Sequence, residues 1–225
     1  LNYCLILLEG EIFMFRDWNF WCTIMTSVAA FIALWLSVRQ IRISNKQQLF
    51  YRRLKLYMLA NGIISLCKEN YKLLSEKREA KPQLAIDIVF MYFINNAYME
   101  SQYQAVMYPL EQPFHNEFLK KREELRSMAM EFELIFKGDI ALRYSDFLRD
   151  YEKTLSVMYQ YQIIIKKINE ENSKCPRSLE ELSQRFSEKK YRDSLYEALD
   201  KLRESYDAVA QEKVEKKLRK QLVLI

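Results

Sequence analysis

The stretch "WNFWCTIMTSVAAFIALWLSV", residues 18–38, runs for 21 residues without one acid or base. A helix rises about 1.5 Å per residue, so this run makes roughly 31 Å of helix, close to the roughly 30 Å of hydrocarbon in a bilayer. The core helix of a soluble protein usually carries charge on the side that meets water. The run therefore predicts a single transmembrane helix.

The polar residues inside this run fit the same interpretation. Its threonine and serine hydroxyls can donate back to carbonyls of their own helix. Trp18 and Trp21 lie at one end and Trp35 lies near the other, and indole rings favour the headgroup level of a membrane. The run is too long for a cleaved signal peptide, and no small-residue cleavage site follows it. We expect an anchor that stays in the protein.

Basic residues follow the run and predict its orientation. Residues 39–68 contain seven lysines and arginines and no acid, so the positive-inside rule places the C-terminal part in the cytoplasm and the N-terminus outside. The anionic inner leaflet attracts such residues. The expected membrane-interface residues are Trp18, Trp21, Trp35, Arg39, Arg42, Lys46, Arg52, Arg53 and Lys55.

The net charge of +5 arises beside the expected anchor. Residues 69–225 hold 27 basic and 27 acidic residues, so this larger part is neutral overall. A sequence pI near 8.9 suggests a nucleic-acid binder at first sight. Assigning the basic excess to membrane topology weakens that interpretation.

We expect residues 14–38 to form an N-terminal tail and the anchor, and residues 39–225 to form a cytoplasmic helical domain. Residues 1–13 precede Met14, and a purine-rich ribosome-binding sequence can encode the Leu8, Glu9 and Gly10 found there. We interpret residues 1–13 as an upstream over-reading, with translation beginning at Met14, or as a short leader.

The scarcity of glycine and proline predicts an all-α fold. The chain has three glycines and four prolines, too few for the tight turns that strands need. We expect the anchor helix to continue to about residue 80, followed by an antiparallel bundle of helices over about residues 83–108, 116–137 and 140–169. The capping box of Ser178 and Glu181 begins a long C-terminal helix that runs almost to the end.

Two features of this last helix suggest partners. One is a seam with coiled-coil spacing, which either closes the bundle or pairs with a helix of another chain, as in a homo-oligomer. Its members are Leu195, Leu199, Leu202, Tyr206 and Val209. The other is a basic cluster that either contacts phosphates of a single-stranded nucleic acid or a partner, or is a solvated helix end. Its members are Lys213, Lys216, Lys217, Arg219 and Lys220.

Few residues are candidates for catalysis or metal binding. His115 is the only histidine, and the cysteines at 4, 22, 67 and 175 have no metal-site spacing, so we expect free thiols, no metal and no cofactor. No glycine-rich phosphate loop is present. We therefore predict that the chain is not an enzyme. Asn95, Asn96 and Glu100 interrupt an aromatic segment and either join packed helices or form a ligand-binding patch.

The stretch "SVRQIRISNKQQLFYRRLKLY", residues 37–57, resembles the anchor-to-cytoplasm junction of many small bacterial membrane proteins of unassigned function. The shared pattern is Leu49, Phe50, Arg53, Leu54 and Tyr57. The layout of one N-terminal anchor and a helical part rich in Lys, Ile and Tyr resembles the membrane-anchored abortive-infection proteins of lactococci, which block phage multiplication.

This resemblance implies phage defence at the cytoplasmic membrane, in which the bundle binds a phage protein, a host component or nucleic acid. The alternative is a non-enzymatic membrane scaffold that acts through helix pairing.

Overall fold

The computed structural model describes residues 2–75 and 85–222, with side chains for residues 18–75, 85–86, 88–211 and 213–222. Every regular element within these ranges is a helix, which confirms the all-α prediction. The chain divides into two units, Leu1–Leu49 and Phe50–Ile225. We call the second one the compact unit. The translation start at Met14 stays a prediction.

Helix α1, Asn2–Glu69, forms all of the first unit that the structure describes and continues into the compact unit. It passes Gly62 without interruption, so the expected continuation of the anchor helix is confirmed. Two of its hydroxyls bond as expected: the Thr23 Oγ1 donates to the Asn19 carbonyl at 2.8 Å, and the Ser27 Oγ donates to the Thr23 carbonyl at 2.7 Å. These hydroxyls are thus satisfied within the helix.

Helix α1 ends at Glu69 rather than near residue 80. The Asn70 side-chain amide donates to the Leu66 carbonyl at 2.9 Å and to the Tyr92 carbonyl at 3.2 Å. It thereby satisfies the end of one helix and ties it to a distant segment. A short helix, α2 (Tyr71–Ser75), follows. The remainder of the predicted helix, residues 76–80, lies outside the described residues, as does Pro82.

The prediction of a single helix over residues 83–108 is wrong. The segment contains α3 (Asp87–Ile94), the 3-10 helix η1 (Glu100–Gln102) and α4 (Tyr103–Met107). The break falls at the asparagines, because the Asn96 Oδ1 accepts from the Met99 amide at 2.9 Å. Such a side-chain bond competes with the helical ladder.

The next two helices lie close to their predicted positions. Helix α5 covers Phe114–Ile135 and α6 covers Asp139–Lys174. Gly138 lies between them and directly precedes α6, with a φ of 79° that suits glycine. The contacts of Arg122 with Glu152 and of Glu133 with Ser145 show that α5 and α6 run antiparallel.

The prediction of one long C-terminal helix is also wrong. This region forms the helices α7 (Leu179–Arg185), α8 (Glu188–Val209) and α9 (Glu212–Leu222). Its start is correct, since the Glu181 amide donates to the Ser178 Oγ at 3.2 Å. Ser187 divides α7 from α8 with a left-handed φ of 52°. In an unbroken helix Val209 and Val214 would point about 140° apart. The second break lets both be buried.

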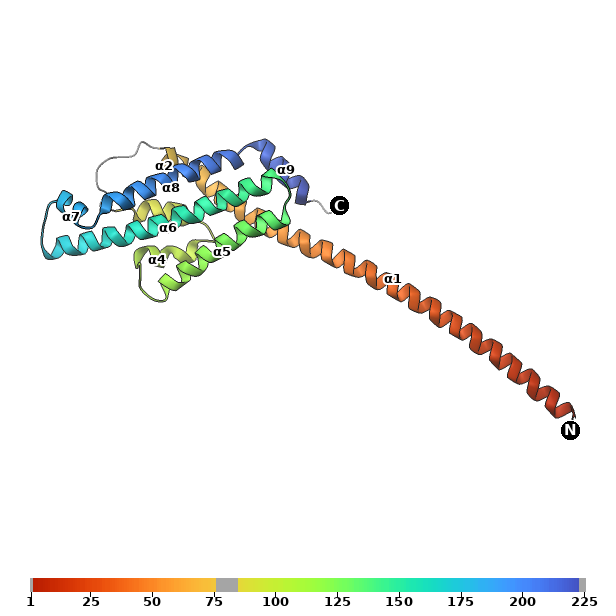
Figure 1. The fold of residues 1–225 in the computed structure, drawn as a ribbon. Coiled ribbons are helices and arrows are strands. Elements are labelled where there is room, and N and C mark those ends of the chain that lie inside the picture. The colour runs from red at the N-terminus through yellow and green to blue at the C-terminus, as the bar shows by residue number, and fades with distance from the viewer. Residues whose placement is uncertain (1, 76–84, 223–225) are drawn as a thin grey trace. The chain divides into compact units, whose positions relative to one another are not determined.

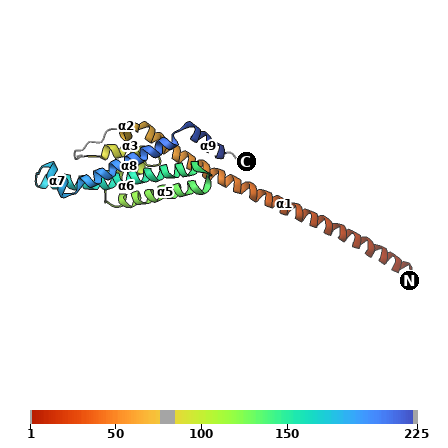
Figure 2. The ribbon, with the colours of Figure 1, turned by 45° about the horizontal axis from the view of Figure 1, so that its top comes forward.

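Helix α6 is the centre of the compact unit and lies between α5 and α8 (Figure 1). It packs on all sides, since eight of the nine residues from 151 to 159 are buried. Helix α2 lies against α8 and α3 against α6 (Figure 2). The α1 residues Leu56, Ala60, Ile63 and Cys67 belong to the same core.

Two buried carboxylates join the helices. Glu152 of α6 accepts from the Arg122 Nε at 2.6 Å and lies 3.2 Å from the Arg126 Nη2. Glu188 of α8 is fully buried and accepts from the hydroxyls of Tyr161 and Ser183. The Arg192 Nε lies 3.4 Å from its Oε1. A buried carboxylate needs such partners, because isolating a charge in a protein interior is costly.

Replacing Arg192 with methionine tests this network. The substitution leaves Glu188 buried without its cation, so the free energy of unfolding should fall by about 3–5 kcal/mol. Urea unfolding of the full chain in detergent, followed by circular dichroism, measures the change. The control Lys189→Met alters an exposed residue of the same helix and should change stability by less than about 0.5 kcal/mol. Equal stability of Arg192→Met and the original chain would contradict the network.

Candidate functional site

The uncharged run of α1 presents its apolar side chains outward. Every side chain from residue 18 to 49 is exposed, including Trp18 at 67%, Phe31 at 73% and Trp35 at 61%. The segment is long and apolar enough to cross a membrane, and none of its most apolar window is buried. The Arg39 guanidinium lies 5.5 Å from the centre of the Trp35 ring, at the end of the run.

The basic residues expected at the membrane interface fall into two groups. Arg39, Arg42 and Lys46 are exposed on α1 in the first unit. In the compact unit Arg52 and Lys55 are also exposed, and the Arg52 Nε lies 3.8 Å from a Glu131 carboxylate oxygen. These positions leave their charges accessible.

Arg53 differs from the other expected interface residues, because it is half-buried and its guanidinium is used inside the compact unit. Its Nη1 donates to the Gln221 carbonyl at 2.8 Å and its Nη2 to the Ile135 carbonyl at 3.1 Å. Both carbonyls belong to the last turns of helices, where backbone acceptors lack helical partners. Arg53 is therefore a structural residue that joins α1 to the ends of α5 and α9.

The predicted basic cluster lies on α9, with Lys213, Lys217 and Lys220 exposed. Arg219 contacts the compact unit: its Nε donates to the Tyr57 hydroxyl at 2.9 Å and its Nη2 lies 2.7 Å from a Glu215 oxygen. Lys216 is exposed and has an interaction of its own. The cluster thus divides into a bound arginine and a set of exposed lysines.

The predicted pairing seam is internal. Leu195, Leu199, Leu202, Tyr206 and Val209 are all buried. They line the side of α8 that packs within the core, and α6 is its principal neighbour. Of the two alternatives, the seam closes the bundle. It offers no surface to another chain.

Asn95, Asn96 and Glu100 line a hollow of about 460 Å³ together with Tyr92 and Tyr103. Asn96 bonds to the local backbone rather than across packed helices, so the structural role expected for it is wrong. The ligand-binding alternative for this patch stays a prediction.

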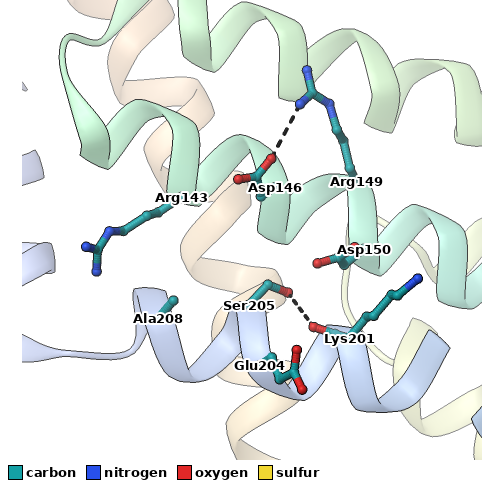
Figure 3. Close-up of a pocket in the computed structure, with 8 residues that line it drawn as sticks. All are labelled: Arg143, Asp146, Arg149, Asp150, Lys201, Glu204, Ser205 and Ala208. Atoms are coloured by element: carbon teal, nitrogen blue, oxygen red, sulfur yellow. Dashed lines mark hydrogen bonds and ion pairs between the residues drawn. The ribbon is translucent and has the colours of Figure 1, made fainter. Parts of the chain in front are cut away.

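A charged groove of about 390 Å³ lies between α6 and α8 (Figure 3). Its charged residues are Arg143, Asp146, Arg149, Asp150, Lys201 and Glu204. All three of its cations are paired with nearby acids. The Arg143 Nε lies 2.7 Å from Asp139, the Arg149 Nη2 2.6 Å from Glu133, and the Lys201 Nζ 2.8 Å from Glu197. The groove is therefore an ion-pair network on the surface.

Asp150 is the distinctive group of this groove. Figure 3 shows its carboxyl directed toward α8, near Ser205 and Lys201. Partial burial raises the pKa of Asp150, and the neighbouring Asp146 and Glu204 add to the shift, while Ser205 and Lys201 oppose it. A half-buried carboxyl of this kind holds its proton to a higher pH than an ordinary aspartate.

The histidine lies in an aromatic contact. The His115 Nδ1 is 2.9 Å from the Tyr159 hydroxyl, and the two rings stack with centres 5.8 Å apart. The same hydroxyl accepts from the Leu110 amide at 2.9 Å. Burial raises the pKa of Tyr159. Within the described ranges, no group of three His, Cys, Asp or Glu side chains is placed to hold a metal ion.

Sequence reasoning missed Glu152 and Glu188, although the sequence contains a signal for both. The seam spacing, extended backwards from Leu195, reaches Arg192 and Glu188. Glu152 likewise lies four residues after Leu148 and three before Leu155. A charge on an apolar helical stripe indicates a paired, buried group.

No protein-family model, curated protein or solved structure gives a significant match to this chain.

Replacing Asp150 with asparagine tests the environment of the groove. Because the pKa of Asp150 is higher in the folded than in the unfolded protein, the folded state binds its proton more tightly. Stability due to this group is therefore highest at low pH and falls as the pH rises above 3.8 through the raised value. Asp150→Asn should raise stability at neutral pH by less than about 1 kcal/mol, since solvent screens the group.

This gain should disappear in thermal unfolding measured below the ordinary aspartate pKa of 3.8. The control Asp146→Asn removes the carboxylate that lies 3.4 Å from the Arg149 Nη1 and should bring no gain at neutral pH. A loss of stability in Asp150→Asn at neutral pH would contradict this expectation. It would show that the favourable interactions of the Asp150 carboxylate exceed the cost of burying its charge.

Proposed function

We propose that this chain is a single-span membrane protein of bacterial phage defence, of the abortive-infection type. Its compact unit lies in the cytoplasm and acts by binding a phage or host component rather than by catalysis. The observation that carries the membrane part of the proposal is the complete exposure of residues 18–38.

Exposure of this run in water is costly. Burying one large apolar side chain gains roughly 1.5–3 kcal/mol, and here Trp18, Phe31 and Trp35 are all more than half exposed. The hydroxyls of Thr23, Thr26 and Ser27 donate within the helix, which suits hydrocarbon because it supplies no hydrogen-bond partners. A bilayer is therefore the environment that this surface fits.

The charges around the run support a cytoplasmic compact unit. Arg39, Arg42 and Lys46 follow the run and are exposed, and no acid occurs between residues 39 and 68. Lysine and arginine close to a membrane span are the residues that set its orientation.

Several observations argue against catalysis and against the scaffold alternative, and binding is the activity that we therefore propose. The charged groove on α6 and α8 is an ion-pair network, and His115 is engaged by Tyr159. The scaffold alternative depended on the seam of α8, which is buried within the compact unit. Phage defence is supported by the layout of one anchor and one helical unit, which resembles that of the lactococcal abortive-infection proteins.

Two arginines in the centre of the run test the anchor. Val28→Arg with Phe31→Arg adds roughly 5–7 kcal/mol to the cost of insertion, so the double variant should leave the membrane pellet and appear in the soluble or aggregated fraction. The control Ser44→Arg with Gln47→Arg adds the same charge beyond the run and should stay in the membrane. Retention of both variants would contradict the proposal.

The same variants test phage defence. Cells that express the original chain should show fewer or smaller plaques when challenged with a panel of phages, and the Val28→Arg, Phe31→Arg cells should not. The Ser44→Arg, Gln47→Arg cells should resemble those with the original chain. Equal plaque numbers and sizes in expressing and empty cells across the panel would contradict the phage-defence proposal. The proposal of a membrane anchor would not be affected.

Cys175 reports the orientation, because it is an exposed thiol of the compact unit. Burial raises the pKa of Cys67 to about 12, so that thiol stays unreactive. In a Cys4→Ser, Cys22→Ser background, a membrane-impermeant maleimide should label Cys175 only after the membrane of spheroplasts is opened. Labelling of closed spheroplasts would place the compact unit outside.

A further inference from the structure

Three segments of the compact unit are joined at one end. The Arg53 guanidinium of α1 binds the Ile135 and Gln221 carbonyls at 3.1 and 2.8 Å. The Gln221 side chain in turn accepts from the Lys137 amide at 2.8 Å and donates to the Lys137 carbonyl at 3.0 Å. The end of α9 and the connection between α5 and α6 therefore lie together, beside the α1 turn that contains Arg53.

Helix α9 presents two different sides at this end. Val214 and Leu218 are buried against the core. Lys213, Lys217 and Lys220, spaced at four and three residues, follow one another along the exposed side. Residues with this spacing lie on one face of a helix. Helix α9 thus carries a stripe of lysines directed away from the core.

Four acids near this end whose side chains the structure describes are paired with arginines. The pairs are Arg52 with Glu131, Arg149 with Glu133, Arg143 with Asp139, and Arg219 with Glu215. In contrast, no ion pair joins Lys137, Lys213, Lys217 or Lys220 to a carboxylate whose side chain the structure describes. Among the described side chains, the arginines therefore neutralise these four acids, and the four lysines carry positive charge that no carboxylate pairs with.

An exposed apolar residue belongs to the same end of the compact unit. Leu134 is 85% exposed, and it directly precedes Ile135, whose carbonyl binds Arg53. Lysines combined with a protruding leucine are typical of protein surfaces that lie on a membrane, where the charges meet headgroups and the apolar group enters the boundary.

We propose that this surface binds the anionic headgroups of the bilayer that holds the anchor. We call it the lysine face and define it as Leu134, Lys137, Lys213, Lys217 and Lys220. The inference rests on the proposed membrane anchoring. Only fourteen residues lie between Val38 and Arg53 in the sequence, so the anchor keeps the lysine face at a high effective concentration near the lipid.

The composition of the face favours lipid over nucleic acid. Sites for single strands combine basic residues with aromatic rings on which bases stack. Helix α9 contains no aromatic residue, and the Tyr57 ring beside it is half-buried, with its hydroxyl bound by Arg219. The protruding group of the face is an aliphatic leucine.

The test uses the full chain reconstituted into nanodiscs of phosphatidylcholine alone or of phosphatidylcholine with about one-third phosphatidylglycerol. Hydrogen exchange of the α9 amides, followed by mass spectrometry, is the readout. One lysine near an anionic surface changes binding roughly five-fold, so exchange should slow at least several-fold in the anionic discs. Raising the salt to about 1 M, where the Debye length is about 3 Å, should abolish this protection.

Two triple variants make the test specific. Lys213→Gln, Lys217→Gln and Lys220→Gln should remove the lipid-dependent protection. The matched control Lys120→Gln, Lys167→Gln and Lys189→Gln removes the same charge from exposed sites on α5, α6 and α8 and should keep it. Lysine-to-arginine changes at 213, 217 and 220 keep the charge and should also keep protection, which separates loss of binding from loss of folding.

The outcomes distinguish the inference from the membrane proposal. Insertion into neutral discs tests the anchor and does not depend on the lysine face. Equal α9 exchange in both kinds of disc would overturn the inference while the anchor stands. Protection of α9 in neutral discs by single-stranded RNA, and not by anionic lipid, would also overturn it, because the lysines would then form a nucleic-acid site.

Discussion

The uncharged run of α1 is exposed on every side, and the environment that it requires determines where the whole chain can lie. In a soluble core helix, neighbouring elements would cover residues such as Phe31 and Trp35, but both are more than half exposed. The backbone groups of the run and the hydroxyls of Thr23, Thr26 and Ser27 are bonded within α1. Such a surface is unfavourable in water and favourable in hydrocarbon. The proposed location, orientation and lipid contact all follow from that preference.

The compact unit handles its many charges differently. Residues 69–225 carry equal numbers of acids and bases. Several of these side chains pair with one another inside the fold. Glu152 receives two arginines of α5, and the buried Glu188 is surrounded by Tyr161, Ser183 and Arg192. These contacts orient α5, α7 and α8 on the central α6. The exposed lysines of α9 then stand out, because the arginines around them are already paired.

Much of the fold was predictable from local signals. The long apolar run, the spacing of α5 and α6 and the Ser178 cap each depend on neighbouring residues. Two of the helix breaks, after Glu69 and between α8 and α9, were not predictable in the same way. Asn70 is held by Tyr92 and α9 turns to bury Val214, and such contacts join positions that the sequence does not show to be close.

The site residues divide along the same line. The charge pattern predicts a membrane interface at Arg39, Arg42 and Lys46, and the structure shows that these three residues are exposed. Arg53 looked identical in the sequence, yet it binds carbonyls of residues 135 and 221. The seam of α8 was predictable as a helix contact, but not that its partner is α6. Glu188 occupies a position of that same seam, so closer attention to its spacing would have found the buried carboxylate.

The three tryptophans of the chain all lie in the uncharged run, and their fluorescence tests the central claim directly. The full chain is reconstituted into vesicles whose acyl chains carry bromine either near the headgroup or near the bilayer centre. If the run spans the bilayer, both lipids quench the emission, and bromine near the headgroup quenches it more strongly. Emission that neither lipid quenches would show that these rings do not contact lipid, and the account would be wrong.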